Sequence, residues 1–160
     1  MEANVLGNGK FDRNGVDLSI PTITCNFLNL DLNPIATATW DYKAISKVNL
    51  NEVTTKILAP RLIQDIDYPN KDLLVIVQAS TVRNSGQLAA EYLIQQGYTR
   101  INLYGITSRF KCDLSSESDK YYPKRTDNAV TRIDKWNKVW DQMINSNTHV
   151  EFNFVEHNQA

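Results

Sequence analysis

Hydrophobic residues are most concentrated in the middle of the chain, where they predict a strand, a helix and a second strand. Residues 73–77 (LLVIV) are continuously apolar, which is typical of a strand buried on both faces of a parallel sheet. A helical face follows, with Asn84 or Ser85 as its N-cap and Gly97 as its stop, formed by Leu88, Ala89, Tyr92 and Leu93. Residues 101–106 (INLYGI) predict the next strand. We therefore expect a right-handed βαβ unit whose two strand ends lie side by side.

Weaker patterns predict the elements on either side of this unit. Partial alternation over residues 22–30 predicts a strand, and residues 37–42 predict a second short one. A helix N-capped by Asn51 is expected to continue to Ile66 with a break at Pro60. The three- and four-residue spacing of apolar positions from Val130 to Ile144 predicts the longest helix, and residues 150–154 predict a half-exposed strand near an edge.

Two segments lack hydrophobic periodicity. The first 20 residues contain the turn dipeptides Asn8-Gly9 and Asn14-Gly15, which predict either a short hairpin or a loose tail. Residues 111–126 form a long polar loop. The whole chain, 1–160, therefore predicts one α/β domain, a three-layer sandwich with a mixed, mostly parallel sheet of about 4–6 strands built around the central βαβ unit.

Composition narrows the class of protein further. The chain has 160 residues, of which 42% are hydrophobic and 22% charged, and these values exclude a disordered or fibrous protein. The net charge of −1 gives no signal for nucleic acid or an anionic membrane as partner. The N-terminus does not resemble a signal peptide, and no apolar run is long enough to span a bilayer. We therefore expect a cytoplasmic protein in which Cys25 and Cys112 are reduced, mostly structural thiols.

The ends of the two central predicted strands carry the strongest candidate for a binding site. Ligands of open α/β sheets bind beyond the carboxyl ends of the strands, and a helix N-terminus there favours an anion. Arg side chains add bidentate recognition of phosphate or carboxylate. The competing interpretation is ordinary helix capping, since the loop lacks the glycines of a known phosphate-binding fingerprint. The predicted ligand-binding residues are Gln78, Ser80, Thr81, Arg83, Thr107, Ser108 and Arg109.

The sequence leaves open both whether the protein is a catalyst and whether it uses a cofactor. His149 and His157 have no ligand-like spacing, so no metal site is expected, and there is no G-x-S-x-G elbow. Cys112 is either an incidental cysteine or a reactive thiol. Asp31 and Asp41 follow candidate strands, and each is either a surface turn residue or a base at the site.

Two further features have both a structural and a functional interpretation. The polar loop carries Lys120, Tyr121, Tyr122, Lys124 and Arg125, so it is a solvated loop, a lid over the strand ends, or a contact for single-stranded nucleic acid. Acidic residues in the same loop make the nucleic-acid interpretation the weaker one. Trp136 and Trp140 share one face of the long helix, which is either core or a homodimer surface.

Part of the chain resembles a family of small bacterial and phage proteins of unknown function. The family pattern is W-D, then an apolar strand ending L-N-P-S-T, then W-G-Y and V-N-L-F. The corresponding residues here are Trp40-Asp41, residues 73–81 (LLVIVQAST), Gln96-Gly97-Tyr98 and residues 101–104 (INLY). Gln78-Ala79 replaces the distinctive Asn-Pro pair. The resemblance implies a fold and a pocket near Gln78 to Thr81, without implying a reaction.

Together these features predict a small cytoplasmic α/β protein that binds a small anionic or phosphate-bearing ligand at the strand ends near Ser80 and Thr107. The alternative is a non-catalytic protein-interaction module of phage or plasmid accessory type, with homodimerisation through the aromatic helix.

Overall fold

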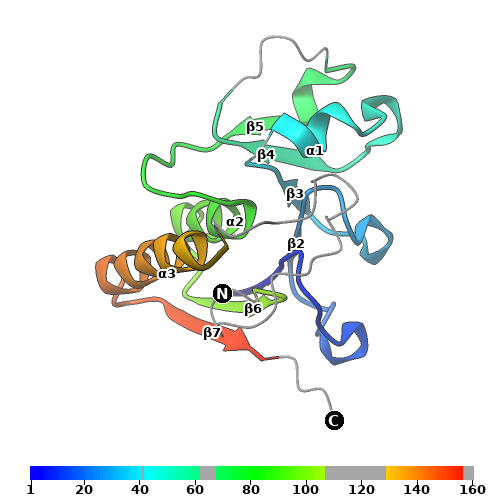
Figure 1. Cartoon of the computed structure of the whole chain (residues 1–160). Helices are drawn as coiled ribbons and strands as arrows, with labels where there is room; N and C mark the ends of the chain where they lie inside the picture. Colours follow the sequence, from blue (N-terminus) through cyan, green and yellow to red (C-terminus); the bar gives the residue numbers. More distant parts are fainter. Residues whose placement is uncertain (41, 62–67, 107–128, 157–160) are drawn as a thin grey trace.

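In the computed structural model, the chain forms one parallel sheet with helices packed against it (Figure 1). The structure describes residues 1–40, 42–61, 68–106 and 129–156. The strands are β1 (Glu2–Leu6), β2 (Thr22–Cys25), β3 (Ala36–Ala38), β4 (Lys56–Ala59), β5 (Leu74–Ile76), β6 (Arg100–Tyr104) and β7 (Glu151–Val155). The helices are α1 (Tyr42–Ser46), α2 (Ser85–Gln95) and α3 (Ala129–Ser146).

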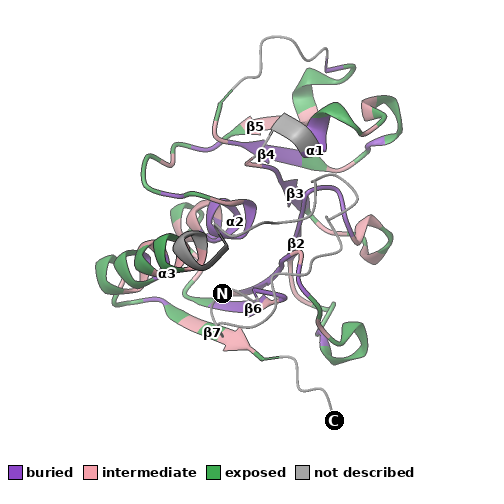
Figure 2. Cartoon of the chain, viewed as in Figure 1, coloured by how far each residue is buried: buried purple, intermediate pink, exposed green. Residues whose placement is uncertain are grey.

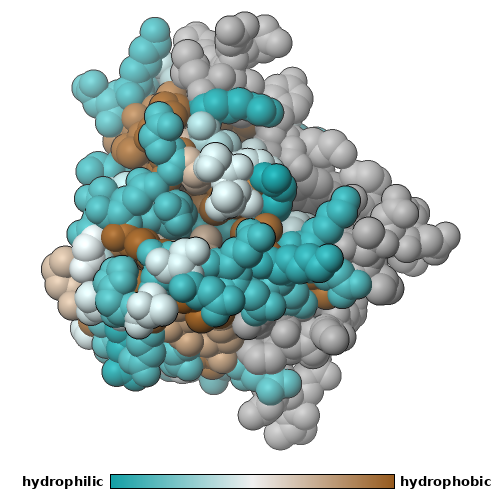
Figure 3. Space-filling model, turned by 90° about the vertical axis from the view of Figure 1, so that its left-hand side faces the viewer, coloured by the Kyte–Doolittle hydropathy of each residue, from teal (hydrophilic) through white to brown (hydrophobic). Residues whose placement is uncertain are grey.

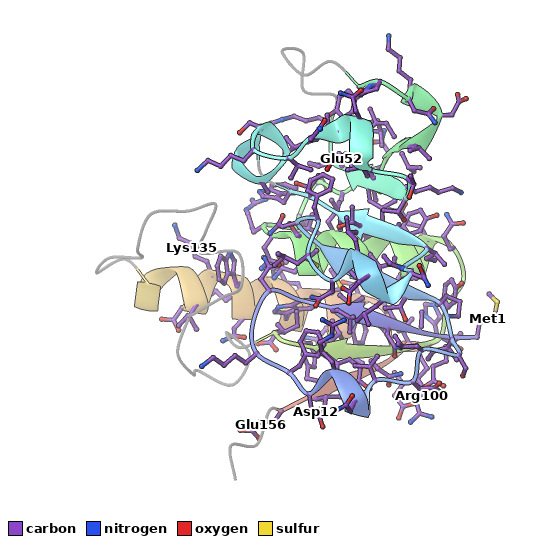
Figure 4. All side chains as sticks on the ribbon, turned by 90° about the vertical axis from the view of Figure 1, so that its right-hand side faces the viewer. Met1, Asp12, Glu52, Arg100, Lys135 and Glu156 are labelled. Atoms are coloured by element: carbon purple, nitrogen blue, oxygen red, sulfur yellow. The ribbon has the colours of Figure 1, made fainter. Side chains whose placement is uncertain are left out.

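The strand order is β5-β4-β3-β2-β1-β6-β7, and every neighbouring pair in this sheet is parallel. The α/β class is therefore confirmed, but the sheet has seven strands where about 4–6 were expected, and it is purely parallel instead of mixed. Because β1 lies between β2 and β6, the chain builds outward from β1 in one direction and then returns to build in the other. Because all strands run in the same direction, they begin at one edge of the sheet, the amino edge, and end at the other, the carboxyl edge. In Figure 4, Met1 and Arg100 lie at the amino edge and Glu156 lies toward the carboxyl edge.

The expectation for the first 20 residues is wrong, because they contain the interior strand β1 and form neither a hairpin nor a loose tail. The expected helix starting at Asn51 is also wrong up to Ala59, and its second part, residues 62–66, lies outside the described residues. The chain forms a 3-10 turn at Leu50–Glu52 and then the buried strand β4. Val53, Ile57 and Leu58 have helical spacing, but Ile57 and Leu58 point to opposite faces of the sheet and belong to different hydrophobic clusters.

The expected βαβ unit is wrong in the placement of its two strands. Its elements exist, with α2 capped by Asn84 and followed by Gly97. Its strands are not neighbours, because β4, β3, β2 and β1 separate β5 from β6. β5 is an edge strand with Ile76 exposed, so the continuous apolar run at residues 73–77 does not mark the centre of the sheet. The expected edge position of the last strand, β7, is confirmed.

The main hydrophobic core lies between the sheet and the pair α2 and α3. Alternate residues of the central strands, such as Val5, Ile23 and Leu103, meet Leu88 and Leu93 of α2 in this core (Figure 2). Trp140 of α3 is fully buried and packs edge-on against Phe154, with 5.2 Å between ring centroids. The outward side of these helices is mostly hydrophilic over the part that the structure describes (Figure 3).

The opposite face of the sheet is covered by α1 and irregular connections. A smaller cluster of Phe27, Ile45, Val53, Ile57 and Tyr68 packs there. The connections contain short 3-10 turns, and three of these turns begin at an Asp or Asn whose side chain accepts a hydrogen bond from the backbone N–H two residues later. Such local bonds favour turns over longer helices. The β1–β2 connection, which the structure describes in full, contains one such turn and no regular crossover helix.

A polar ladder crosses this second face. Asn4, Asn102 and Asn153 are in register on β1, β6 and β7, and each donates an amide hydrogen bond to the next polar group in line: Asn153 to Asn102 at 3.2 Å, Asn102 to Asn4 at 3.2 Å, and Asn4 to Thr22 at 3.2 Å. Asn4 is fully buried, so its amide depends on these partners. The ladder therefore fixes the register of the central strands.

Candidate functional site

The strand order creates a switch point at the carboxyl ends of β1 and β6. The chain continues from β1 toward β2 on one side and from β6 toward β7 on the other. In open α/β sheets, the crevice outside such a point is where ligands bind. Two glycine-containing segments meet here, Gly7–Gly9 after β1 and Gly105 after β6.

The backbones of these two segments approach closely. Gly7 N–H donates to the Tyr104 carbonyl at 2.7 Å, and Gly9 N–H donates to the Gly105 carbonyl at 2.8 Å. A Cβ on Gly7 would lie 2.6 Å from Ile106 Cδ1, and a Cβ on Gly105 would lie 2.8 Å from the Gly9 carbonyl oxygen. Gly105 also has a φ of +69°, which a residue with a side chain rarely adopts. Only glycine fits at these two positions.

The N-terminus of α2 lies over the same edge. Ser85 Oγ accepts a hydrogen bond from Trp40 N–H, just after β3, at 3.0 Å, and donates one to Asn26 Oδ1, just after β2, at 2.9 Å. A Cβ on Gly86 would lie 3.0 Å from Ile106 Cδ1, just after β6. The first turn of α2 is therefore held against the ends of β2, β3 and β6, next to the end of β1.

This first turn carries backbone donors without partners. The Asn84 side chain accepts from Gln87 N–H at 2.9 Å, and Leu88 N–H donates to the Asn84 carbonyl at 3.0 Å. Ser85 and Gly86 are buried, and within the described part of the chain their N–H groups have no acceptor. Such groups at a helix N-terminus carry a partial positive charge.

The structure places the ligand-binding residues predicted from the sequence in different parts of the molecule. Arg83 lies at the α2 N-terminus, where its N–H donates to Gln87 Oε1 at 2.8 Å. The Gln78 carbonyl accepts from Gln95 in the last turn of α2, about 15 Å along the helix from Ser85. Ser80 and Thr81 are exposed in the connection between them. The expectation that these residues converge with the end of β6 through adjacent strands is wrong, since four strands intervene.

Several other predicted residues lie outside the described residues: Thr107, Ser108, Arg109, Asp41, Cys112, His157, and Lys120 to Arg125 of the polar loop. Of the rest, Asp31 is an exposed turn residue paired with Arg13, which holds the pKa of the Asp31 carboxyl below its ordinary value. Burial raises the pKa of Cys25 to about 12, so this thiol stays protonated and fits the structural role expected of it. Trp140 is core, so it is not available to a dimer surface.

Sequence reasoning missed the residues that β1 and β2 bring to this edge, chiefly Gly7, Asn8 and Asn26. A signal was present, because the apolar stretch at residues 3–6 (interrupted only by Asn4) is followed directly by Gly-Asn-Gly. A strand followed by glycines typically marks a close backbone approach. Among the described residues, no cluster of three potential metal-ligating side chains exists, and no helix is long and apolar enough to cross a membrane.

Arg83, two residues before Ser85, brings a positive charge to this edge. The described residues that follow β1, β2, β3 and β6 directly, and those of the first turn of α2, include no carboxylate. A phosphate placed there would meet backbone N–H groups, amides and a guanidinium, and no carboxylate among these described residues. The sequence has no match among protein-family models or curated proteins.

Proposed function

We propose that this protein binds a small phosphate-bearing anion at the carboxyl edge of its sheet, with the first turn of α2 as the phosphate site. The observation that carries the proposal is the position, at the β1/β6 switch point, of the Ser85 and Gly86 N–H groups, which have no acceptor among the described residues. A helix N-terminus at a switch point combines the partial charge that attracts an anion with the crevice that admits it.

Arg83 supports the same conclusion. Its guanidinium is exposed and bonds only to carbonyl oxygens of its own loop within the described residues, at 3.1 Å to Val82 and 3.5 Å to Ser80. These weak neutral contacts leave its charge free to pair with an arriving anion. No nucleophile and base meet at the described edge, so the proposal is one of binding.

The first position of a helix offers a selective test, because proline is accepted there and has no N–H. Ser85 is that residue, and the preceding Asn84 is extended, as proline requires of its predecessor. Ser85→Pro and Ser85→Ala both lose the hydroxyl bonded to Asn26 and Trp40, whereas only Ser85→Pro loses the backbone donor. The second variant is therefore the matched control for the first.

We expect inorganic phosphate, titrated by isothermal calorimetry, to bind Ser85→Pro at least about tenfold more weakly than Ser85→Ala, because a hydrogen bond to a charged group is lost. Arg83→Ala should weaken binding about two- to fivefold and reduce its salt dependence. Arg100→Ala, at the amino edge, is the control for charge and should bind like the wild type. Equal affinities of the two Ser85 variants would exclude α2 as the phosphate site.

A further inference from the structure

The Asn26 side chain presents a fixed and unused donor at the proposed phosphate site. Only 3% of Asn26 is exposed. Trp40 N–H donates to Ser85 Oγ, and the Ser85 hydroxyl in turn donates to Asn26 Oδ1 at 2.9 Å. Because the Ser85 hydroxyl donates to Oδ1, the Nδ2 group is the part of the Asn26 amide that remains to bond another partner. Asn26 Nδ2 donates to none of the described residues.

Asn8 presents the complementary group, an unused acceptor. Its Oδ1 is buried and has no hydrogen-bond partner in the described part of the chain. Asn8 and Asn26 each lie two positions beyond Leu6 and Thr24, the last residues paired between β1 and β2. The donor and the acceptor therefore end neighbouring strands. A buried polar group without a partner is costly and requires an explanation such as an absent ligand.

The backbone around Asn26 is also held in an uncommon conformation. Asn26 and Phe27 have φ values of +54° and +63°. Asn tolerates this region, but Phe rarely adopts it. The conformation is maintained by bonds from Asn26 N–H to the Ala38 carbonyl at 2.9 Å and from Phe27 N–H to Thr37 Oγ1 at 3.1 Å. The fold therefore places the Asn26 amide at this edge despite the backbone cost.

We propose that the ligand is a phosphorylated sugar, either free or as the ribose phosphate of a nucleotide, and that one sugar hydroxyl lies between Asn8 and Asn26. This inference rests on the proposed phosphate site at α2. A fully ionised phosphate or carboxylate only accepts hydrogen bonds, so it cannot satisfy Asn8 Oδ1. A hydroxyl donates to Asn8 Oδ1 and accepts from Asn26 Nδ2 at the same time. A sugar phosphate carries such a hydroxyl close to its phosphate.

The test compares inorganic phosphate, ribose 5-phosphate and a nucleoside 5′-monophosphate by calorimetric titration of the full chain. We expect the wild type to bind ribose 5-phosphate about tenfold more tightly than inorganic phosphate, since it adds two hydrogen bonds. Asn8→Ala should reduce that preference by about three- to tenfold and leave the affinity for inorganic phosphate unchanged. Asn26→Gly also removes the acceptor of the Ser85 hydroxyl, so it should weaken the binding of ribose 5-phosphate about three- to tenfold more than it weakens the binding of inorganic phosphate. A nucleotide that binds more tightly than ribose 5-phosphate identifies a nucleotide site, and equal affinity identifies a sugar-phosphate site.

The variants are chosen to remain folded. Asn8→Ala removes an unsatisfied buried acceptor, so its melting temperature should equal or exceed that of the wild type. Asn26→Gly keeps a residue that accepts positive φ, and Asn33→Gly, at an exposed turn with a φ of +54°, is its control. If inorganic phosphate binds but ribose 5-phosphate has no advantage, the sugar inference is overturned and the phosphate site stands. If neither binds, both proposals fail.

Discussion

The two faces of the sheet are built differently from the same strands. One face is apolar and lies under α2 and α3, with Trp140, Leu88 and Leu103 fully buried. The other combines a small apolar cluster with the asparagine ladder and is covered largely by irregular connections held by single side-chain bonds. The difference shows that regular helices supply the bulk of the core, while the loop-covered face supplies strand register and the turn geometry that places Asn26 at the carboxyl edge.

Two neighbouring residues of β4 test most directly whether the two faces are packed differently. Leu58 faces the helices and Ile57 faces the loops. We expect Leu58→Ala to reduce the free energy of unfolding by about 3–5 kcal/mol and Ile57→Ala by about 2–3 kcal/mol, because irregular loops collapse into a cavity more readily than packed helices do. Urea unfolding followed by circular dichroism measures both. An equal or reversed order would show that the loop-covered face is packed as rigidly as the helical one.

The asparagine ladder provides a test of the polar part of the second face. Asn102→Ala removes the partner of Asn4 Oδ1, a fully buried group, and should cost about 1–3 kcal/mol in unfolding free energy. Asn153→Ala is the control, since Asn153 is exposed at the edge strand and only donates to Asn102 in the ladder. If the two substitutions are equally mild, the ladder does not stabilise the register.

The smallest expected effect is a pH dependence from the exposed pair Arg13 and Asp31, which joins two of the irregular connections. Arg13 lowers the pKa of Asp31 in the folded state. The pair therefore stabilises the fold above the unfolded-state pKa of about 3.9, and this contribution is lost as the pH falls through the lower folded-state value. Melting temperatures of the wild type and Asp31→Asn should differ slightly at pH 6 and converge near pH 2. A difference that persists in acid would exclude this cause.

The sequence predicts those elements of the fold that have a clear hydrophobic pattern and misses those that lack one. α2, β6, α3 and β7 each match a predicted element because hydrophobic residues recur over several turns or alternate along a strand. β4 was mistaken for a helix because a strand of four residues is too short to display alternation, while the neighbouring Val53 completes a helical spacing by coincidence. β1 was missed because the buried Asn4 interrupts its apolar pattern to serve the ladder.

The candidate site was predictable only where it depends on local signals. Arg83 and the cap at Asn84 follow from the start of α2 and lie at the candidate site. Asn8 and Asn26 join them through strand order, which brings residues far apart in sequence to one edge. No local pattern encodes that order, and the apolar run at β5 pointed to the wrong strand as the centre.

The position of β1 between β2 and β6 has a consequence for how the chain folds. Asn4 pairs with Thr22 soon after both are synthesised, but its other partner, Asn102, comes 98 residues later. Until then the second edge of β1 has no strand beside it, and unpaired edges promote aggregation. Contacts of such high sequence separation also slow folding. We therefore expect the pairing of β6 with β1 to be a late event in folding, and the carboxyl-edge site to form only when it occurs.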